Sequence, residues 1–120
     1  MRTTAIEVKE IMDDTALTDA IVNAYIKSAN LFVTNHLGAS TLDTDTLADI
    51  ERWVAAHAIA MTRERQAKKE EAGSAKVEYG IVFGVGLLAT SYGQMAIALD
   101  STGTLQTIAD GKTLIKLIAL

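Results

Sequence analysis

The chain has 120 residues and a mass of 12.8 kDa, which is the size of one domain with a single modest core. It contains no cysteine, which excludes disulfides, thiolate metal sites and cysteine nucleophiles, and no proline, so nothing forces a break in its helices. Its 15 acidic residues outnumber its 11 basic ones, and the formal charge of −4 argues against a protein that reads duplex DNA.

The first strong helical signal follows a short segment, residues 3–12, whose pattern fits either a helix or a strand. We expect Thr18 to be the N-cap of a helix, because the apolar residues that follow it are spaced three and four apart, which is typical of an amphipathic helix. We expect this helix to end near Leu37, with Gly38 as its C-cap. Its apolar stripe consists of Ile21, Val22, Tyr25, Ile26, Ala29, Phe32, Val33 and His36.

A second amphipathic helix is predicted after a short polar connection, with Asp43 or Thr44 as its cap. The helix continues into a charged stretch of mixed sign, residues 63–71, and Gly73 ends it. The residues of its apolar stripe are Leu47, Ile50, Val54, His57, Ala58 and Met61. The residues expected to face away from the core are Arg52, Ala56 and Arg63.

The next segment, residues 74–83, alternates apolar and polar residues with a period of two, which is typical of a strand or an extended arm. We expect residues 75–86 to become ordered only when they pair with a neighbouring subunit, because Gly84 and Gly86 are costly to fix. The arm residues expected between subunits are Val77, Tyr79, Ile81 and Phe83. A third helix is predicted over about Thr90 to Leu99.

The last segment, residues 104–120, places an Asp110-Gly111 turn between two apolar runs, a pattern typical of a hairpin. An apolar strand that ends a small domain needs a cover, which can be its own core, a sister subunit or a partner. The residues expected to dock on another protein or subunit are Leu114, Ile115, Leu117, Ile118 and Leu120.

Together these elements predict a mainly α fold: a small helical bundle with a long extended loop or short β arm and an extended C-terminal tail. We place the bundle in residues 1–105 and the docking tail in residues 106–120. The expected core combines Ile21, Tyr25, Phe32, Leu47, Ile50, Val54 and Met61, closed by Met95 and Leu99.

Catalytic and ligand-binding patterns are weak. His36 and His57 lie on or beside apolar stripes, where a packed or interfacial role is the usual one, and no HExxH spacing exists. The acids Asp43, Asp45, Asp49 and Glu51 surround a helix start, where capping and the helix dipole explain them. The glycines form no phosphate-binding motif. We therefore expect no enzymatic activity, no metal and no cofactor.

Two further features concern the environment of the chain. Residues 79–99 carry no charge, but glycines and polar residues interrupt the run, so we expect no membrane span, and the N-terminus has no signal-peptide pattern. Hydrophobic residues make up 49% of the chain and its mean hydropathy is +0.21. This excess of apolar residues favours self-association.

Several segments, read in order, resemble a known family. They are Leu17-Thr18-Asp19-Ala20, the sequence IERWVAAH at residues 50–57, the sequence YGQMAIALD at residues 92–100, and Ser101-Thr102-Gly103. In this order and at these distances, over about residues 5–105, they are similar to the head–tail connector proteins of long-tailed bacteriophages, also called adaptor or head-completion proteins.

The resemblance implies a ring of copies of this chain, normally a dodecamer, bound beneath the portal protein of the capsid. Such a ring extends the DNA channel, completes the head for tail attachment, and offers a platform to the stopper or tail-completion protein. DNA would pass through its lumen without specific recognition. The expected location is the virion, at the head–tail interface, after assembly in the host cytoplasm. The resemblance implies no enzymatic activity and no cofactor.

Two alternatives stay open from the residues alone. One is a small oligomeric helical accessory or regulatory protein unrelated to virions, which would form a discrete small oligomer and never bind a portal. The other is a small enzyme that uses His36, His57 and nearby acids. Loss of an activity on replacement of either histidine would favour the enzyme.

Overall fold

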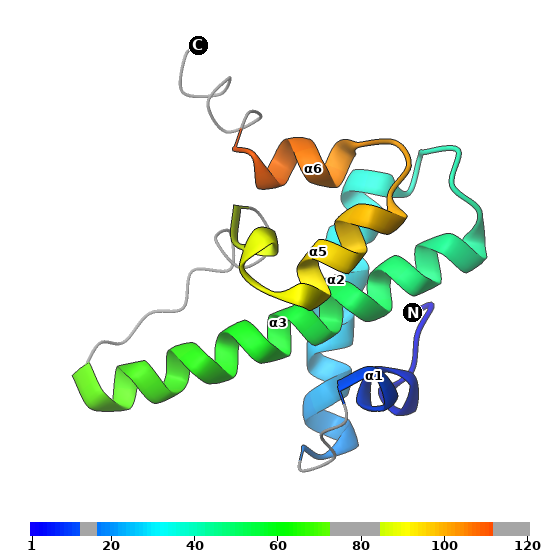
Figure 1. The fold of residues 1–120 in the computed structure, drawn as a ribbon. Helices are drawn as coiled ribbons and strands as arrows, with labels where there is room; N and C mark the ends of the chain where they lie inside the picture. Colours follow the sequence, from blue (N-terminus) through cyan, green and yellow to red (C-terminus); the bar gives the residue numbers. More distant parts are fainter. Residues whose placement is uncertain (13–16, 73–84, 112–120) are drawn as a thin grey trace.

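The computed structural model describes residues 1–12, 17–72 and 85–111, and the side chains within these ranges except those of residues 63–72 and 85. The chain is mainly helical, as predicted, and none of the described residues lies in a strand (Figure 1). The elements are α1 (Ala5–Met12), α2 (Asp19–Leu37), α3 (Thr44–Ala72), the 3-10 helix η1 (Val85–Ala89), α5 (Ser91–Leu99) and α6 (Thr104–Ala109).

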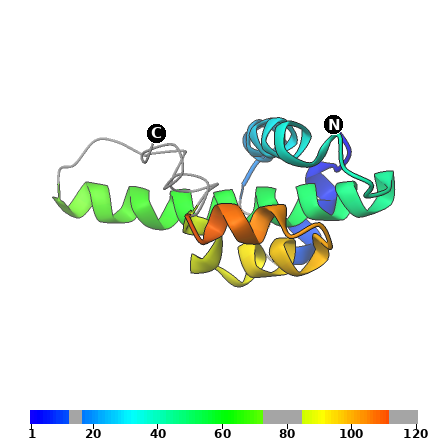
Figure 2. The ribbon, with the colours of Figure 1, turned by 90° about the horizontal axis from the view of Figure 1, so that it is seen from above.

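The long helix α3 lies between α2 on one side and η1 and α5 on the other, as Figure 2 shows. α1 crosses behind α3 in the same view and packs against both α3 and α2. α3 packs against α1, α2 and α5, whereas α6 contacts η1, α2 and α5 at the end of the bundle. A helix covered on two sides needs more than one apolar stripe, and this requirement explains several of the differences from the sequence predictions.

The helix starts follow local capping rules. The Thr18 side chain accepts a hydrogen bond from the Ile21 N–H at 3.3 Å, and the Asp43 carboxylate accepts one from the Thr46 N–H at 2.7 Å. The predicted caps of α2 and α3 are thereby confirmed, with Asp43 as the capping residue of α3. The bond from the Thr46 backbone, with a further one from its side chain, holds the pKa of the exposed Asp43 below its ordinary value.

Gly38 ends α2 as predicted, but for a reason other than a left-handed backbone. Its φ is −62°, and its N–H donates to the Thr34 carbonyl at 3.0 Å. A Cβ at this position would lie 2.4 Å from the Thr34 carbonyl oxygen, so glycine is needed because the backbone approaches so closely.

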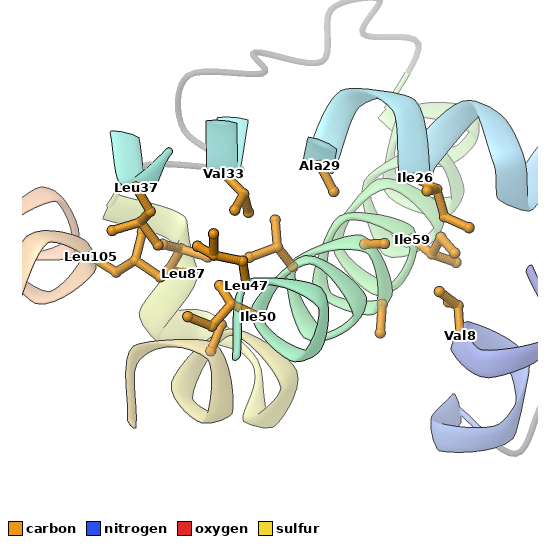
Figure 3. Close-up of a cluster of buried hydrophobic side chains, with 14 of the residues drawn as sticks. Val8, Ile26, Ala29, Val33, Leu37, Leu47, Ile50, Ile59, Leu87 and Leu105 are labelled. Atoms are coloured by element: carbon orange, nitrogen blue, oxygen red, sulfur yellow. The ribbon is translucent and has the colours of Figure 1, made fainter. Parts of the chain in front are cut away.

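The core joins the two sides of α3 (Figure 3). The figure shows Leu37, Leu87 and Leu105 meeting at one end, and Ile26, Ile59 and Val8 at the other. The fully buried residues of α2 are Val22, Ile26, Ala29, Val33 and Leu37. The predicted core residues Leu47, Ile50, Val54 and Met61 are buried, and Tyr25, Phe32 and Leu99 are half-buried at its edge.

Four predicted orientations are wrong, and the first is that of His36, which was placed on the apolar stripe of α2 but is exposed. Ile21 and Met95 were expected in the core but are 44% and 43% exposed, because the buried stripes of α2 and α5 are centred on other residues. Ala56 was expected to face away from the core but is fully buried. α3 buries Ala55, Ala56 and Ile59 as well as its predicted stripe, because it is packed on two sides.

Residues 104–109 form helix α6, where the sequence predicted the first strand of a hairpin. The Asp100 carboxylate accepts hydrogen bonds from the Thr102 N–H at 3.0 Å and the Leu105 N–H at 2.9 Å, which favours a helix start at this place. The predicted turn after this segment is present, and Gly111 has the left-handed φ of 75°. α6 runs across the predicted boundary at 105/106, and its Ala109 is buried with the bundle.

Candidate functional site

The residues predicted from the sequence as interaction sites lie outside the described residues. They are the arm residues Val77, Tyr79, Ile81 and Phe83 and the tail residues Leu114, Ile115, Leu117, Ile118 and Leu120. Their roles, and the expected ordering of residues 75–86, stay predictions.

A hydrogen-bonded junction joins α3 to the start of α5. His57 in α3 is fully buried, and its Nδ1 lies 2.6 Å from the Thr90 hydroxyl oxygen. The same hydroxyl oxygen accepts the Gly93 N–H at 2.9 Å, so Thr90 is the N-cap of α5 and at the same time contacts α3. Helix capping and tertiary packing therefore depend on one hydroxyl group.

Gly93 lets the helices approach closely at this junction. A Cβ on Gly93 would lie 2.0 Å from the Leu87 carbonyl oxygen and 3.0 Å from His57 Nδ1. Beside it, the half-buried rings of Trp53 and Tyr92 stack, with centroids 6.1 Å apart and planes at 29°. The α3–α5 junction, defined by these residues, brings together the segments 50–57 and 92–100 that carry the family resemblance.

The two histidines have different surroundings. His57 is packed at the α3–α5 junction, as expected for a histidine on an apolar stripe. His36 is exposed on α2, with its ring 4.7 Å from that of Phe32. α2 and the α3–α5 junction lie on different sides of α3 (Figure 2), so the structure does not bring the two imidazoles to one site. Within the described part of the chain, no group of three His, Cys, Asp or Glu residues could hold a metal ion.

Glu51 was expected to contribute helix-dipole charge near an exposed helix start, and this expectation is wrong. Its side chain is fully buried. One carboxylate oxygen accepts the backbone N–H groups of Arg2 and Thr3 at 2.9 and 3.0 Å. The other accepts Arg2 Nη1 at 3.0 Å and Asn30 Nδ2 at 2.8 Å. Because its donors come from distant segments, no local pattern could have identified this role.

Two exposed surfaces of the bundle are apolar. The first is a shallow pocket of about 430 Å³ on α2, here called the α2 pocket, whose described lining residues are Ala20, Ile21, Ala24, Tyr25 and Ser28. Exposed apolar residues also occur on η1 and α5, namely Leu88 of η1 and Met95 of α5, each 43% exposed, and the exposed Ala98 of α5; these three residues are here called the α5 surface. Exposed apolar surfaces of this kind are often sites of contact with other proteins.

Comparison with protein-family models, with curated protein sequences and with solved structures found no match. A search of the described helices found none that is both long and apolar enough to cross a membrane.

Proposed function

We propose that this chain is a structural subunit of a bacteriophage head–tail connector, which forms a ring between the portal vertex and the stopper or tail proteins. The observation that carries the proposal is the α3–α5 junction. The two segments on which the resemblance rests, 50–57 and 92–100, are far apart in the sequence and pack against each other through Trp53, Tyr92 and Gly93.

The chemistry of the junction favours a structural role over catalysis. His57 is fully buried and its Nδ1 contacts the hydroxyl group that caps α5, so this atom supports the packing of two helices. Glu51, another buried polar side chain, is surrounded by four donors from the chain itself. In this proposal both groups stabilise the subunit, and neither acts on a substrate.

The charge and apolar surface fit a ring around DNA. Each copy contributes a net charge of −4, and an acidic ring allows DNA to slide through without being gripped. The α2 pocket and the α5 surface supply apolar area for contacts between copies. The predicted tail, residues 113–120, is proposed as the element that docks on the portal or on a neighbouring subunit.

The test is binding to portal-bearing heads. The purified chain should attach to such heads, and electron microscopy should show an added ring below the portal. Deletion of residues 113–120 should abolish attachment while leaving the helical circular-dichroism signal and the melting transition largely intact. The control is Lys116→Ala, which changes the same segment without removing an apolar residue.

Each other outcome has a defined meaning. If the truncated chain unfolds, the tail belongs to the core of its own subunit. If it still completes heads, the tail is not the anchor. If the full chain forms a discrete small oligomer and never binds a portal, the connector proposal is wrong and the accessory-protein alternative is favoured.

A further inference from the structure

Asp110 and Gly111 form the turn that follows α6, the last helix that the structure describes. Asp110 is exposed, and Gly111 has a left-handed φ of 75°. Asp110 is the only aspartate in the sequence that is followed by glycine. The pair has a reactivity of its own, because glycine has no Cβ to shield its backbone nitrogen from the neighbouring carboxyl group.

The folded turn holds the pair in an unreactive geometry. The Gly111 N–H donates to the Ile108 carbonyl at 3.0 Å, and Gln106 Nε2 donates to Asp110 Oδ1 at 2.9 Å. The backbone of Asp110 is helical, with a φ of −73° and a ψ of −10°. Attack of the Gly111 nitrogen on Asp110 Cγ closes a ring. Ring closure requires ψ to rotate away from this value and the Gly111 N–H to leave its acceptor.

This restraint depends on the last turn of a short helix. α6 has six residues, Thr104–Ala109, and a helix of this length is stable only through its packing. Its buried residues Leu105 and Ala109 precede the turn, whereas Asp110 is exposed. Helix ends open at a small cost in free energy, so the Gly111 N–H can be released without unfolding of the bundle.

We propose that Asp110 is a site of spontaneous isomerisation to isoaspartate, which proceeds when the last turn of α6 opens. The Gly111 amide loses its proton, its nitrogen bonds to Cγ of the protonated Asp110 carboxyl group, and one water molecule leaves. A solvent water then opens the cyclic succinimide. Attack at the side-chain carbonyl restores aspartate, whereas attack at the main-chain carbonyl leaves the peptide link on Cγ and gives isoaspartate. No group is oxidised or reduced.

The modified bond lies directly after α6. Isomerisation lengthens the main chain there by one methylene group and places the free carboxylate on the Asp110 Cα. The bond is part of the covalent link between the bundle and the rest of the chain. This inference does not depend on the proposed function.

Asp100 provides a comparison within the same chain. It also precedes a small residue, Ser101, but it is buried. Its two carboxylate oxygens accept backbone N–H groups, one from Thr102 at 3.0 Å and the other from Leu105 at 2.9 Å. These bonds hold the side chain away from the Ser101 nitrogen, so Asp100 should stay unmodified.

The test is incubation of the full chain at neutral pH, followed by peptide mapping. Electron-based fragmentation in a mass spectrometer distinguishes isoaspartate from aspartate, and an isoaspartate methyltransferase with a labelled methyl donor measures it independently. Isoaspartate should accumulate at Asp110 and not at Asp100. Its formation should be about tenfold slower than in guanidinium chloride, because only the open turn reacts. Formation in the unfolded chain alone, or equal formation at Asp100, would overturn the inference.

Asp110→Asn tests the same ring closure with a leaving group that changes the mass. Its succinimide forms with loss of ammonia, so this variant should convert into a mixture of aspartate and isoaspartate. The matched control is Asp19→Asn, at an exposed position followed by Ala20, whose Cβ hinders the attack. This control should convert about tenfold more slowly. Equal conversion of the two variants would contradict a reactive site at Asp110.

Gly111→Ala tests the attacking nitrogen. Because a left-handed φ strains alanine in the folded turn, the comparison is made in guanidinium chloride, where folding plays no part. The variant should form isoaspartate at Asp110 about tenfold more slowly than the unfolded wild type, because the added Cβ shields the nitrogen. An equal rate would mean that the reaction does not pass through this nitrogen.

Discussion

Glu51 joins three separate parts of the chain: the N-terminal residues, α2 and α3. Its carboxylate accepts four hydrogen bonds from Arg2, Thr3 and Asn30 and is fully buried. A buried carboxylate with all its acceptor positions used is stabilised only as long as each donor stays in place. The first residues of the chain are therefore part of the folded bundle.

Replacement of Glu51 by Gln should destabilise the bundle by about 3 kcal/mol. In glutamine, an NH₂ group replaces one of the carboxylate oxygens, so a donor would face the donors that this oxygen now accepts. The Arg2 guanidinium would also lose its ion-pair partner. Urea unfolding followed by circular dichroism measures the loss. The control Glu10→Gln, at an exposed position, should change the free energy of unfolding by less than about 0.5 kcal/mol. Equal stability of Glu51→Gln and the wild type would contradict the role of Glu51.

Gly93 is a second residue whose role depends on its neighbours. Alanine favours a helix over glycine by about 1 kcal/mol, yet Gly93→Ala should destabilise the protein by about 1–3 kcal/mol. The added Cβ would lie 2.0 Å from the Leu87 carbonyl oxygen, so η1 would have to shift away from α5. The control Ala98→Gly, at an exposed position of the same helix, should cost about 1 kcal/mol. A stabilised Gly93→Ala variant would show that the close approach is absent.

At the scale of the elements, α5 begins at a threonine that also contacts α3. Thr90→Val keeps the shape of the side chain but removes the oxygen that accepts the Gly93 N–H and lies 2.6 Å from His57 Nδ1. The expected loss is about 2–3 kcal/mol, the sum of a cap and of a buried hydrogen bond. The matched control Thr18→Val removes only the exposed cap of α2 and should cost about 1 kcal/mol. Thr90→Ser should restore most of the stability, and equal losses for the two valine variants would exclude a tertiary role for Thr90.

The start of α3 should respond to acid through Asp43. Hydrogen bonds from Thr46 lower the pKa of Asp43 in the folded state, so its stabilising contribution is complete above its ordinary pKa of about 4. That contribution is lost as the pH falls through the lowered folded value. Asp43→Asn retains a cap but does not titrate, so the stability advantage of the wild type over this variant should shrink below about pH 4. Unfolding curves of both proteins between neutral pH and pH 2 test this, and parallel pH profiles would contradict it.

At the scale of the whole molecule, α3 lies between α2 on one side and η1 and α5 on the other, and two isoleucines on α2 test this arrangement. Ile26 is fully buried and points toward α3 (Figure 3), whereas Ile21 is 44% exposed. Ile26→Ala should cost about 2–5 kcal/mol and Ile21→Ala less than about 1 kcal/mol, because only the first leaves a cavity in the core. Urea unfolding at low protein concentration, where self-association does not contribute, compares the two. Similar losses would mean that α2 is rotated relative to this arrangement.

The sequence by itself determined the mainly helical class, the boundaries of the long helices and their caps. Thr18 and Asp43 cap through bonds to N–H groups three residues away, and an apolar period of three to four residues is likewise a local property. Interactions of this kind depend only on residues that are close together in the sequence, so the sequence alone predicts them. The core residues of α3 on the predicted stripe, such as Ile50 and Val54, were found in the same way.

The tertiary structure alone decided what lies around each helix. Glu51 is buried because donors 48 and 49 positions away in the sequence reach it, and Ala56 is buried because a second layer covers α3. Residues 104–109 form a helix, and the Asp100 carboxylate accepts the Leu105 N–H in its first turn, although their sequence also fitted a strand. The exposure of Ile21 and Met95 follows from the same layering. A single amphipathic period describes a helix with one covered face, and α3 has two.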